Sequence, residues 1–258
     1  MNLSFKFALI ALHFILGFMI CLALMILPTN INNQLIQYWA KRLLSILKIK
    51  VTLSGEVLKF LGKENYLVVS NHISWLDIPV IFSLKPITFV AASNIKTWPV
   101  IGFFAKISGA IFVDRLRKSS LPEVIEAMNN HFKNNKQSIC IFPEGITSNG
   151  YQVLPFKSNL FQSAFESNQL LLPLSIKYKE NNVLTNRTSF HGSTTLLQSL
   201  KRIAKSNLIE VMVHIGHPIK PTQSRKELSL KLQKVIALKI NLAPHLCGSD
   251  LNVIMTTS

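Results

Sequence analysis

The sequence predicts an α/β protein, a single domain with a largely parallel mixed sheet covered by helices, preceded by an N-terminal membrane-binding helix or helical hairpin. Three observations predict this class. Short runs of β-branched and aromatic residues alternate with helical segments from Val51 onward, which is typical of helix-covered parallel sheets. The residues before Val51 are first apolar and then amphipathic. The length of 258 residues suits one large domain with a short appendage.

An apolar run near the N-terminus predicts a membrane anchor. From Phe7 to Leu27 the sequence contains no Asp, Glu, Lys or Arg, and as a helix it would extend about 32 Å, the thickness of one hydrocarbon core. The alternative is a cleaved signal peptide, but the apolar region of a signal peptide is usually shorter, and no A-x-A-like site follows in MILPTNINNQ. Anchoring is therefore favoured. Pro28 and the asparagines after it are compatible with a crossing helix or with a helical hairpin.

The next segment, QLIQYWAKRLLSILKIKV, predicts an amphipathic helix at the membrane interface. Its tryptophan suits headgroup depth, and each of its cations adds about 1 kcal/mol on an anionic leaflet. The alternative is an ordinary amphipathic helix packed on the domain. By the positive-inside rule, the cations place the following domain on the cytoplasmic face of the inner membrane. The apolar positions are Leu35, Ile36, Trp39, Leu43, Leu44 and Leu47, and the cations are Lys41, Arg42, Lys48 and Lys50.

The formal net charge of +16 predicts a polyanionic partner, which is either nucleic acid or an anionic membrane surface. The cations form no known nucleic-acid-binding module, and the apolar N-terminus favours an anionic phospholipid membrane, so no nucleic-acid partner is expected. The three cysteines, Cys21, Cys140 and Cys247, lack metal-ligand or disulfide-framework spacing, and we interpret them as small hydrophobic residues.

The remaining elements follow from the periodicity of their apolar residues. We divide the chain into an anchor and interfacial helix at residues 1–50, a domain at 51–245 and a peripheral tail at 246–258. The predicted strands are Lys50–Gly55, Asn65–Asn71, Ile87–Ala92, Ala110–Arg115, Ser138–Glu144, Leu170–Tyr178 and Ile209–Gly216. The predicted helices are Ile78–Leu84, Trp98–Ile107, Leu121–Lys133, Lys157–Asn168, Leu196–Ser206 and Arg225–Ile240.

Three of the predicted strands end in polar clusters. The first runs from Asn71 to Asp77, the second is Asp114-Arg115, and the third is Pro143-Glu144-Gly145. Ligands of parallel sheets bind at the carboxyl ends of strands, so these clusters predict one shared site. The glycine-rich nucleotide loops and the G-x-S-x-G and H-E-x-x-H motifs are absent from the sequence.

The first cluster can supply a general base. His72 has the side chain whose ordinary pKa suits proton abstraction near neutral pH, and a carboxylate such as Asp77 can orient its ring. Five positions correspond to about 500° of helix, so the pairing requires His72 in a turn and Asp77 early in the next helix. Pro79 suits such a first helical turn. The alternative is structural, because Ser74-x-x-Asp77 also matches a capping box with Asp in place of Glu.

The other two clusters can bind a substrate. Arg115 offers a planar fork for a phosphate or carboxylate, although it can equally pair with Asp114. Glu144 lies just past a strand and can accept hydrogen bonds from substrate hydroxyls, or it can be a simple turn residue.

Taken in order, these residues resemble the four-block pattern of the glycerolipid acyltransferases, and in particular bacterial 1-acylglycerol-3-phosphate acyltransferases. The blocks are Asn71-His72-x-Ser74-x-x-Asp77, Gly109-x-x-Phe112-Val113-Asp114-Arg115, Phe142-Pro143-Glu144-Gly145 and Leu172-Pro173-Leu174. They span about Ser70 to Lys177, and all four in this order are strongly specific for the family.

The resemblance implies direct acyl transfer without an acyl-enzyme. His72, oriented by Asp77, would take the proton from a lysolipid hydroxyl, which attacks the thioester of acyl-CoA or acyl carrier protein. The thioester is a co-substrate, and no cofactor or metal is implied. The substrate-binding residues that the blocks imply are Arg115 for the acceptor's phosphate, Glu144 and Gly145 for its glycerol end, Pro173 for the acyl-donor side, and Ser74, Phe142 and Pro143 beside them.

Two departures from the family pattern bear on the acceptor. The chain reads Phe142-Pro143-Glu144-Gly145-Ile146-Thr147-Ser148 where the family often has Phe-Pro-Glu-Gly-Thr-Arg-Ser, so the arginine is missing, and LPFKSNLF lacks the glycine that often follows the lysine. Lys157 or Lys106 can replace the missing cation. We expect 1-acyl-sn-glycerol-3-phosphate as the acceptor, giving phosphatidic acid. The alternatives are a lyso-ornithine lipid, whose acyltransferases the stretch SNGYQVLPFKSNLF also resembles, and a non-catalytic basic protein that binds membrane surfaces.

Overall fold

The computed structural model describes residues 3–24, 29–98, 101–114, 117–135, 137–222 and 224–240. All seven predicted strands are present in it. The strands are β1 Ile49–Gly55, β2 Leu67–Ser70, β3 Thr88–Ala92, β4 Ile111–Val113, β5 Ile139–Ile141, β6 Leu171–Glu180, β7 Val183–Leu184 and β8 Ile209–Ile215. The helices are α1 Leu3–Leu24, α2 Thr29–Ile46, α3 Val57–Leu61, α4 Asp77–Leu84, α5 Ile101–Ile107, α6 Leu121–Asn135, α7 Gln162–Glu166, α8 Leu196–Ala204 and α9 Arg225–Lys239. Three 3₁₀ turns lie at Ser93–Thr97, Lys118–Ser120 and Asn159–Phe161.

The strands form one mixed sheet in the order β1-β8-β6-β2-β5-β3-β4, with β7 beside β6. The pairs β1/β8, β2/β6, β2/β5, β3/β5 and β3/β4 are parallel, and β6 is antiparallel to β8. The predicted fold class is therefore confirmed. The strand β2 lies in the middle of the sheet and is buried along its whole length, as expected for a short continuous apolar run.

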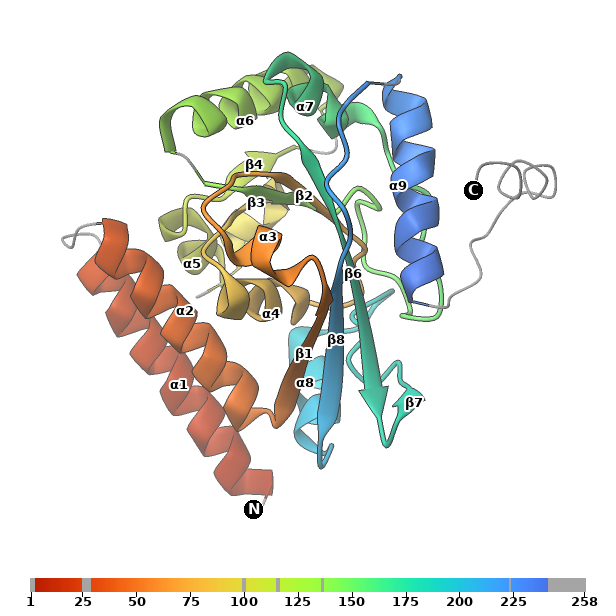
Figure 1. Cartoon of the computed structure of the whole chain (residues 1–258). Helices are drawn as coiled ribbons and strands as arrows, with labels where there is room; N and C mark the ends of the chain where they lie inside the picture. Colours follow the sequence, from red (N-terminus) through yellow and green to blue (C-terminus); the bar gives the residue numbers. More distant parts are fainter. Residues whose placement is uncertain are drawn as a thin grey trace.

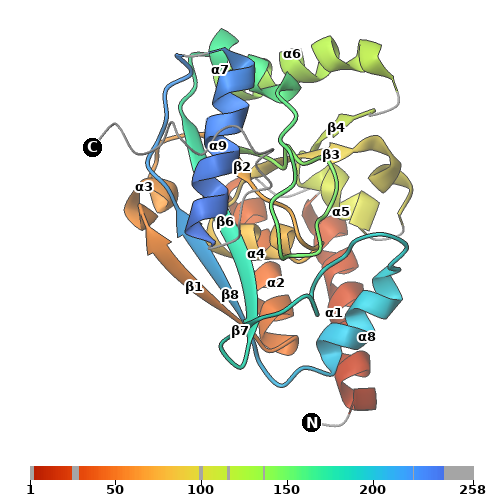
Figure 2. The same cartoon turned by 90° about the vertical axis from the view of Figure 1, so that its right-hand side faces the viewer.

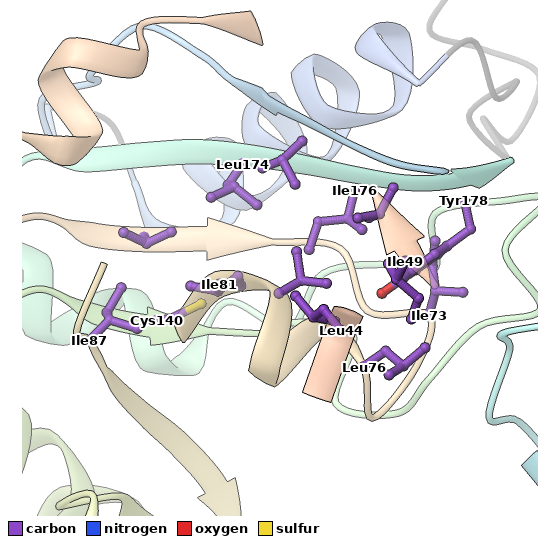
Figure 3. Close-up of a cluster of buried hydrophobic side chains, with 14 of the residues drawn as sticks. Leu44, Ile49, Ile73, Leu76, Ile81, Ile87, Cys140, Leu174, Ile176 and Tyr178 are labelled. Carbon is purple, nitrogen blue, oxygen red and sulfur yellow. The ribbon is translucent and has the colours of Figure 1, made fainter. Parts of the chain in front are cut away.

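Helices cover both faces of the sheet. The helices α1, α2 and α4 lie on one side and α9 lies on the other (Figure 1). One core cluster joins α2, α4 and the sheet, and Figure 3 shows part of it, with Leu44, Leu76, Ile176 and Tyr178. A second cluster joins α6 and α9 to the opposite face. Cys140 of β5 is buried, in agreement with its interpretation as a small hydrophobic residue.

The apolar face of α2 contacts protein, not solvent. Leu43, Leu44 and Leu47 are buried in the first core cluster, and Trp39 packs against its edge. The helix was correctly predicted, but its assignment to the lipid interface through these residues is wrong, because α4 and the edge strand β1 pack against it and its leucines join the core. The alternative, an amphipathic helix packed on the domain, describes this face of α2.

The helices α1 and α2 pack side by side as a helical hairpin (Figure 1). The ring of His13 stacks on Trp39 with centroids 5.0 Å apart, and Trp39 Nε1 donates a hydrogen bond to the His13 carbonyl oxygen at 3.3 Å. At Gly17 a Cβ atom would overlap the side chains of Trp39 and Phe104, so only glycine permits this close approach.

The outward face of α1 is apolar. Among the described helices, none combines the length and the apolar character that crossing a membrane requires. The large apolar side chains that α1 exposes are Phe5, Leu12, Ile15, Leu16, Phe18, Met19 and Leu22. They recur at helical spacing and form what we call the outer α1 face.

A buried lysine attaches α1 to α8. Lys6 Nζ donates to the carbonyl oxygens of Ala204, at 2.8 Å, and Ser206, at 3.4 Å. These carbonyls lie at the C-terminal end of α8, where the helix dipole favours a cation. Burial lowers the pKa of Lys6. Figure 2 shows α8 beside α1.

Some predicted boundaries were wrong. The helix expected at 157–168 is a 3₁₀ turn followed by the short α7, because the Lys157 N–H donates to the Pro143 carbonyl oxygen at 2.9 Å and keeps the chain extended there. Asn168, with φ +48°, follows just after the end of α7. The short α3 and β7 were not predicted. The tail predicted at 246–258 lies outside the described residues.

Candidate active site

The structure brings His72 and Asp77 together at the carboxyl end of β2. The chain turns after Ser70, and α4 begins at Asp77. Asp77 is fully buried, and its Oδ2 lies 2.8 Å from His72 Nδ1. A carboxylate only accepts hydrogen bonds, so Nδ1 carries the proton and Nε2 of the neutral ring is free to accept one. The His72 side chain is 18% exposed, so solvent or substrate can reach it.

The turn between them does not form a complete capping box. The Ser74 hydroxyl accepts from the Leu76 N–H at 3.2 Å. The Asp77 carboxylate does reach back, because its Oδ2 accepts from the N–H groups of Ile73 at 2.7 Å and Ser74 at 3.0 Å. The same carboxylate oxygen thus orders the turn and holds His72, so the structural and the functional interpretations describe one arrangement.

Two residues of β6, Ile176 and Tyr178, hold this turn, and the sequence did not point to either of them. The Asn71 side chain makes two hydrogen bonds to the backbone of Ile176, at 2.9 and 2.8 Å. The Tyr178 hydroxyl donates to Asp77 Oδ1 at 2.7 Å. Burial and the nearby Asp77 charge raise the pKa of Tyr178 well above its usual value. The available sequence signal was a tyrosine inside a buried strand, where its hydroxyl needs a partner.

Glu144 contacts the His72 backbone and is 3% exposed. Its Oε1 accepts from the His72 backbone N–H at 2.6 Å, and its Oε2 accepts from the Leu154 N–H at 2.9 Å. Burial raises the pKa of Glu144 to about 8, although the two backbone donors act in the opposite direction. Both oxygens are occupied by the protein's own backbone, so the carboxylate orders the site from within.

The residues around Glu144 shape the surface beside His72. Phe142 stacks on the His72 ring, with centroids 4.0 Å apart. Gly145 has φ +75°, a conformation that favours glycine, and its N–H donates to the Phe142 carbonyl oxygen at 3.0 Å. A Cβ atom on Gly145 would lie 3.0 Å from Lys157 Nζ, so a lysine ammonium lies directly over this turn.

The segment at Phe190 and the turn after Glu144 both contact the backbone of the His72 turn. The Phe190 N–H donates to the Ile73 carbonyl oxygen at 2.9 Å, and the Thr147 hydroxyl donates to the Phe190 carbonyl oxygen. The Ser148 N–H donates to the His72 carbonyl oxygen at 2.8 Å. The backbone on both sides of His72 is therefore fixed by hydrogen bonds.

The other predicted site residues are placed less directly. Arg115 lies outside the described residues. Pro143 is buried, and Pro173 lies within β6, in register with Val69 and packed against Gly216. Lys96, a cation that the sequence did not point to, lies in the 3₁₀ turn after β3, and its Nζ is 4.7 Å from the centroid of the Phe112 ring of β4. Among the described residues no group of three or more His, Cys, Asp or Glu side chains could hold a metal ion.

Comparison with known proteins identifies the family. The family model described as Acyltransferase matches residues 48–177. A lyso-ornithine lipid O-acyltransferase of Pseudomonas aeruginosa is 30% identical over 214 residues, which cover 82% of this chain and 80% of that protein. A 1-acyl-sn-glycerol-3-phosphate acyltransferase of Neisseria gonorrhoeae is 29% identical over 165 residues, which cover 64% of each chain.

A solved structure supports the same fold. The crystal structure of the 1-acyl-sn-glycerophosphate acyltransferase PlsC from Thermotoga maritima matches with a TM-score of 0.69 over 93% of each chain, at 22% sequence identity. The resemblance of the four sequence blocks is confirmed by the match at 48–177, which contains most of the site described above. The chain belongs to the Acyltransferase family of enzymes.

Proposed function

We propose that this chain is a membrane-associated lysolipid O-acyltransferase that uses His72 and Asp77 for general-base catalysis. The observation that carries the proposal is the 2.8 Å contact between Asp77 Oδ2 and His72 Nδ1, which leaves Nε2 free to accept a proton. Nε2 takes the proton of the acceptor hydroxyl while the hydroxyl oxygen attacks the thioester carbonyl of acyl-CoA or acyl carrier protein. The new ester C–O bond forms, the C–S bond breaks, and the thiolate leaves with a proton from the imidazolium.

Positioning supplies much of the remaining rate enhancement. General-base assistance typically contributes about 10²–10⁴-fold, so the acceptor and the thioester have to be held in the reactive geometry. The two hydrogen-bonded loops and Glu144 fix His72 for this purpose. We propose that Gly145, Phe142 and the Lys157 ammonium form the surface that receives the acceptor's head group.

For the acceptor we favour a lyso-ornithine lipid over 1-acyl-sn-glycerol-3-phosphate, the reverse of the order expected from the sequence. The lyso-ornithine lipid enzyme of Pseudomonas aeruginosa aligns over more of this chain than the glycerol-phosphate enzyme of Neisseria gonorrhoeae. Thr147, in place of the arginine common in the family, carries no charge, and its hydroxyl donates to the Phe190 carbonyl oxygen. One cation, Lys157, suits a single carboxylate as well as a phosphate.

We further propose that the N-terminal hairpin holds the enzyme on an anionic membrane, on the cytoplasmic face of the inner membrane. The support is the outer α1 face, whose large apolar side chains are exposed at helical spacing. Lys41 and Arg42 are exposed on α2, where they can contact lipid phosphates. In this proposal residues 1–50 are the anchor, 51–245 are the catalytic domain and 246–258 are a peripheral tail.

The test measures acyl transfer by the purified full-length chain in vesicles. Acyl-CoA or acyl carrier protein is offered with a lyso-ornithine lipid or, separately, with 1-acyl-sn-glycerol-3-phosphate. We expect turnover with the first acceptor, and a His72→Ala variant should lose about 10²–10⁴-fold in kcat. His217→Ala is the matched control, because His217 is exposed and pairs with Glu56. Turnover with the glycerol phosphate alone would reverse the choice of acceptor, and full activity of His72→Ala would refute the mechanism.

A further inference from the structure

The strand β6 contacts the His72 turn at two points. The first contact is the Asn71 side chain, whose amide group donates to the Ile176 carbonyl oxygen and accepts from the Ile176 N–H. The Asn71 amide thereby acts as one more residue in the ladder between β2 and β6. Because Asn71 directly precedes His72, this pairing fixes where the turn leaves the sheet.

The second contact follows from the alternation of side chains along β6. Residues two positions apart in a strand point to the same face, so Tyr178 lies on the same face as Ile176 and projects toward the turn. Figure 3 shows Tyr178 among Ile49, Ile73 and Ile176. Its hydroxyl reaches Asp77 Oδ1 at 2.7 Å, although the two residues are 101 positions apart in the sequence.

The two oxygens of the Asp77 carboxylate have different surroundings. Oδ2 accepts from His72 Nδ1 and from the backbone N–H groups of Ile73 and Ser74. Oδ1 accepts from Tyr178. A fully buried carboxylate is costly unless donors satisfy both oxygens. The Tyr178 bond also prevents rotation of the carboxylate, which would carry Oδ2 away from His72.

We infer that Tyr178 is a positioning residue, which holds the Asp77 carboxylate in the orientation that directs His72 toward the acceptor. This inference rests on the proposed general-base mechanism. Tyr178 does not touch the reacting atoms and acts through Asp77. A tyrosine that only fills the core would contribute to stability alone, whereas a positioning residue affects kcat and its pH dependence.

The chain offers a matched control for a tyrosine hydroxyl. Tyr66 is also fully buried in the same core cluster, but its hydroxyl donates to the exposed Glu64, away from the His72 turn. The variants Tyr178→Phe and Tyr66→Phe each remove one hydroxyl from a buried ring. They therefore differ chiefly in whether the lost hydrogen bond reached Asp77.

The experiment measures kcat, KM and the pH profile of kcat/KM for both variants in vesicles. We expect Tyr178→Phe to lower kcat by about 10- to 100-fold, with KM for either substrate changed by less than about two-fold. Its acidic limb should move to higher pH, because more of the carboxylate's charge is then left to stabilise the imidazolium. Tyr66→Phe should keep the wild-type profile.

The outcomes separate the inference from the mechanism. Wild-type kcat and pH profile in Tyr178→Phe, or equal losses in both tyrosine variants, would overturn the positioning role while leaving the mechanism in place. Activity in His72→Ala and Asp77→Asn would refute the mechanism itself. If Tyr178→Phe does not fold, 3-fluorotyrosine at position 178 keeps the ring and gives a stronger donor. The acidic limb should then move to lower pH, and an unmoved limb would overturn the inference.

Discussion

The His72 turn and the outer α1 face depart in opposite ways from the ordinary distribution of polar and apolar groups. In the turn, Asp77 and Glu144 are charged-type side chains that are buried and fully hydrogen-bonded. On α1, large apolar side chains lie in contact with solvent. The difference shows how each region is stabilised, because the protein itself satisfies the oxygens of these two buried carboxyl groups, whereas no part of the chain that the structure describes covers the outer α1 face. The predictions below test this contrast.

The largest effect is expected in the His72 turn. Asp77→Asn should lower kcat by about 10²–10⁴-fold, because an amide has one acceptor oxygen in place of two and its NH₂ group opposes either the Tyr178 hydroxyl or the His72 Nδ1 proton. Steady-state kinetics with a circular dichroism spectrum would measure it. A folded Asp77→Asn variant with near wild-type kcat would show that the hydrogen-bond network is structural.

The second largest effect is expected on the outer α1 face. Replacement of Leu12, Ile15 and Met19 by serine should weaken binding to anionic vesicles by about 10-fold or more, because each apolar side chain contributes on the order of 1 kcal/mol or more when it enters lipid. Vesicle co-sedimentation would measure the loss, while kcat in detergent micelles should not change. Leu230→Ser with Leu238→Ser on α9 is the control. Equal losses of vesicle binding in both variants would argue against a specific membrane-facing α1 surface.

A smaller effect is expected where the buried site meets solvent. Lys157→Met should raise KM for the acceptor by about 3- to 10-fold and leave KM for the thioester unchanged, because the ammonium over Gly145 is proposed to bind the acceptor's anionic group. Lys231→Met on α9 serves as the control. A rise in KM for both substrates would indicate that Lys157 does not distinguish them.

The last prediction concerns stability and not activity, and it rests on Glu144. Its pKa is 4.5 in an unfolded chain and about 8 in the folded protein, so between these values the folded state binds more protons. Rising pH over this window therefore lowers the free energy of unfolding. The Tm of the wild type should fall over this window relative to that of Glu144→Gln, by about 2–4 °C for each kcal/mol. Thermal unfolding at several pH values measures this difference. Plots of Tm against pH that run parallel for the two proteins would contradict the raised pKa of Glu144.

The sequence predicted the strands and the His72–Asp77 pair because both leave local signals. Each strand is a short apolar run, and the pair lies within one turn. Tyr178 left no such signal, since its partner Asp77 is 101 positions away and only the register of β6 against β2 brings them together. The face of α2 was misassigned for a related reason. An apolar stripe predicts burial but does not say whether a sheet or a membrane buries it.

The predicted role of Glu144 shows a further limit. The spacing of the third block placed this carboxylate correctly at the end of β5. Only the structure shows that its two oxygens bind the backbone N–H groups of His72 and Leu154. Local sequence identifies which residues gather at a strand end. Whether each of these side chains binds the substrate or the protein's own backbone depends on loops that are remote in the chain.

The Lys6 contact with α8 has a mechanical consequence. Lys6 fastens one end of α1 to the C-terminus of α8, and Gly17 lets the middle of α1 press against Trp39 and Phe104. A helix that is held at two points along its length keeps a fixed position relative to the domain. For an enzyme that works at a membrane surface as proposed, the height of His72 above the lipid is then set by the fold, and every acceptor must present its hydroxyl at that height.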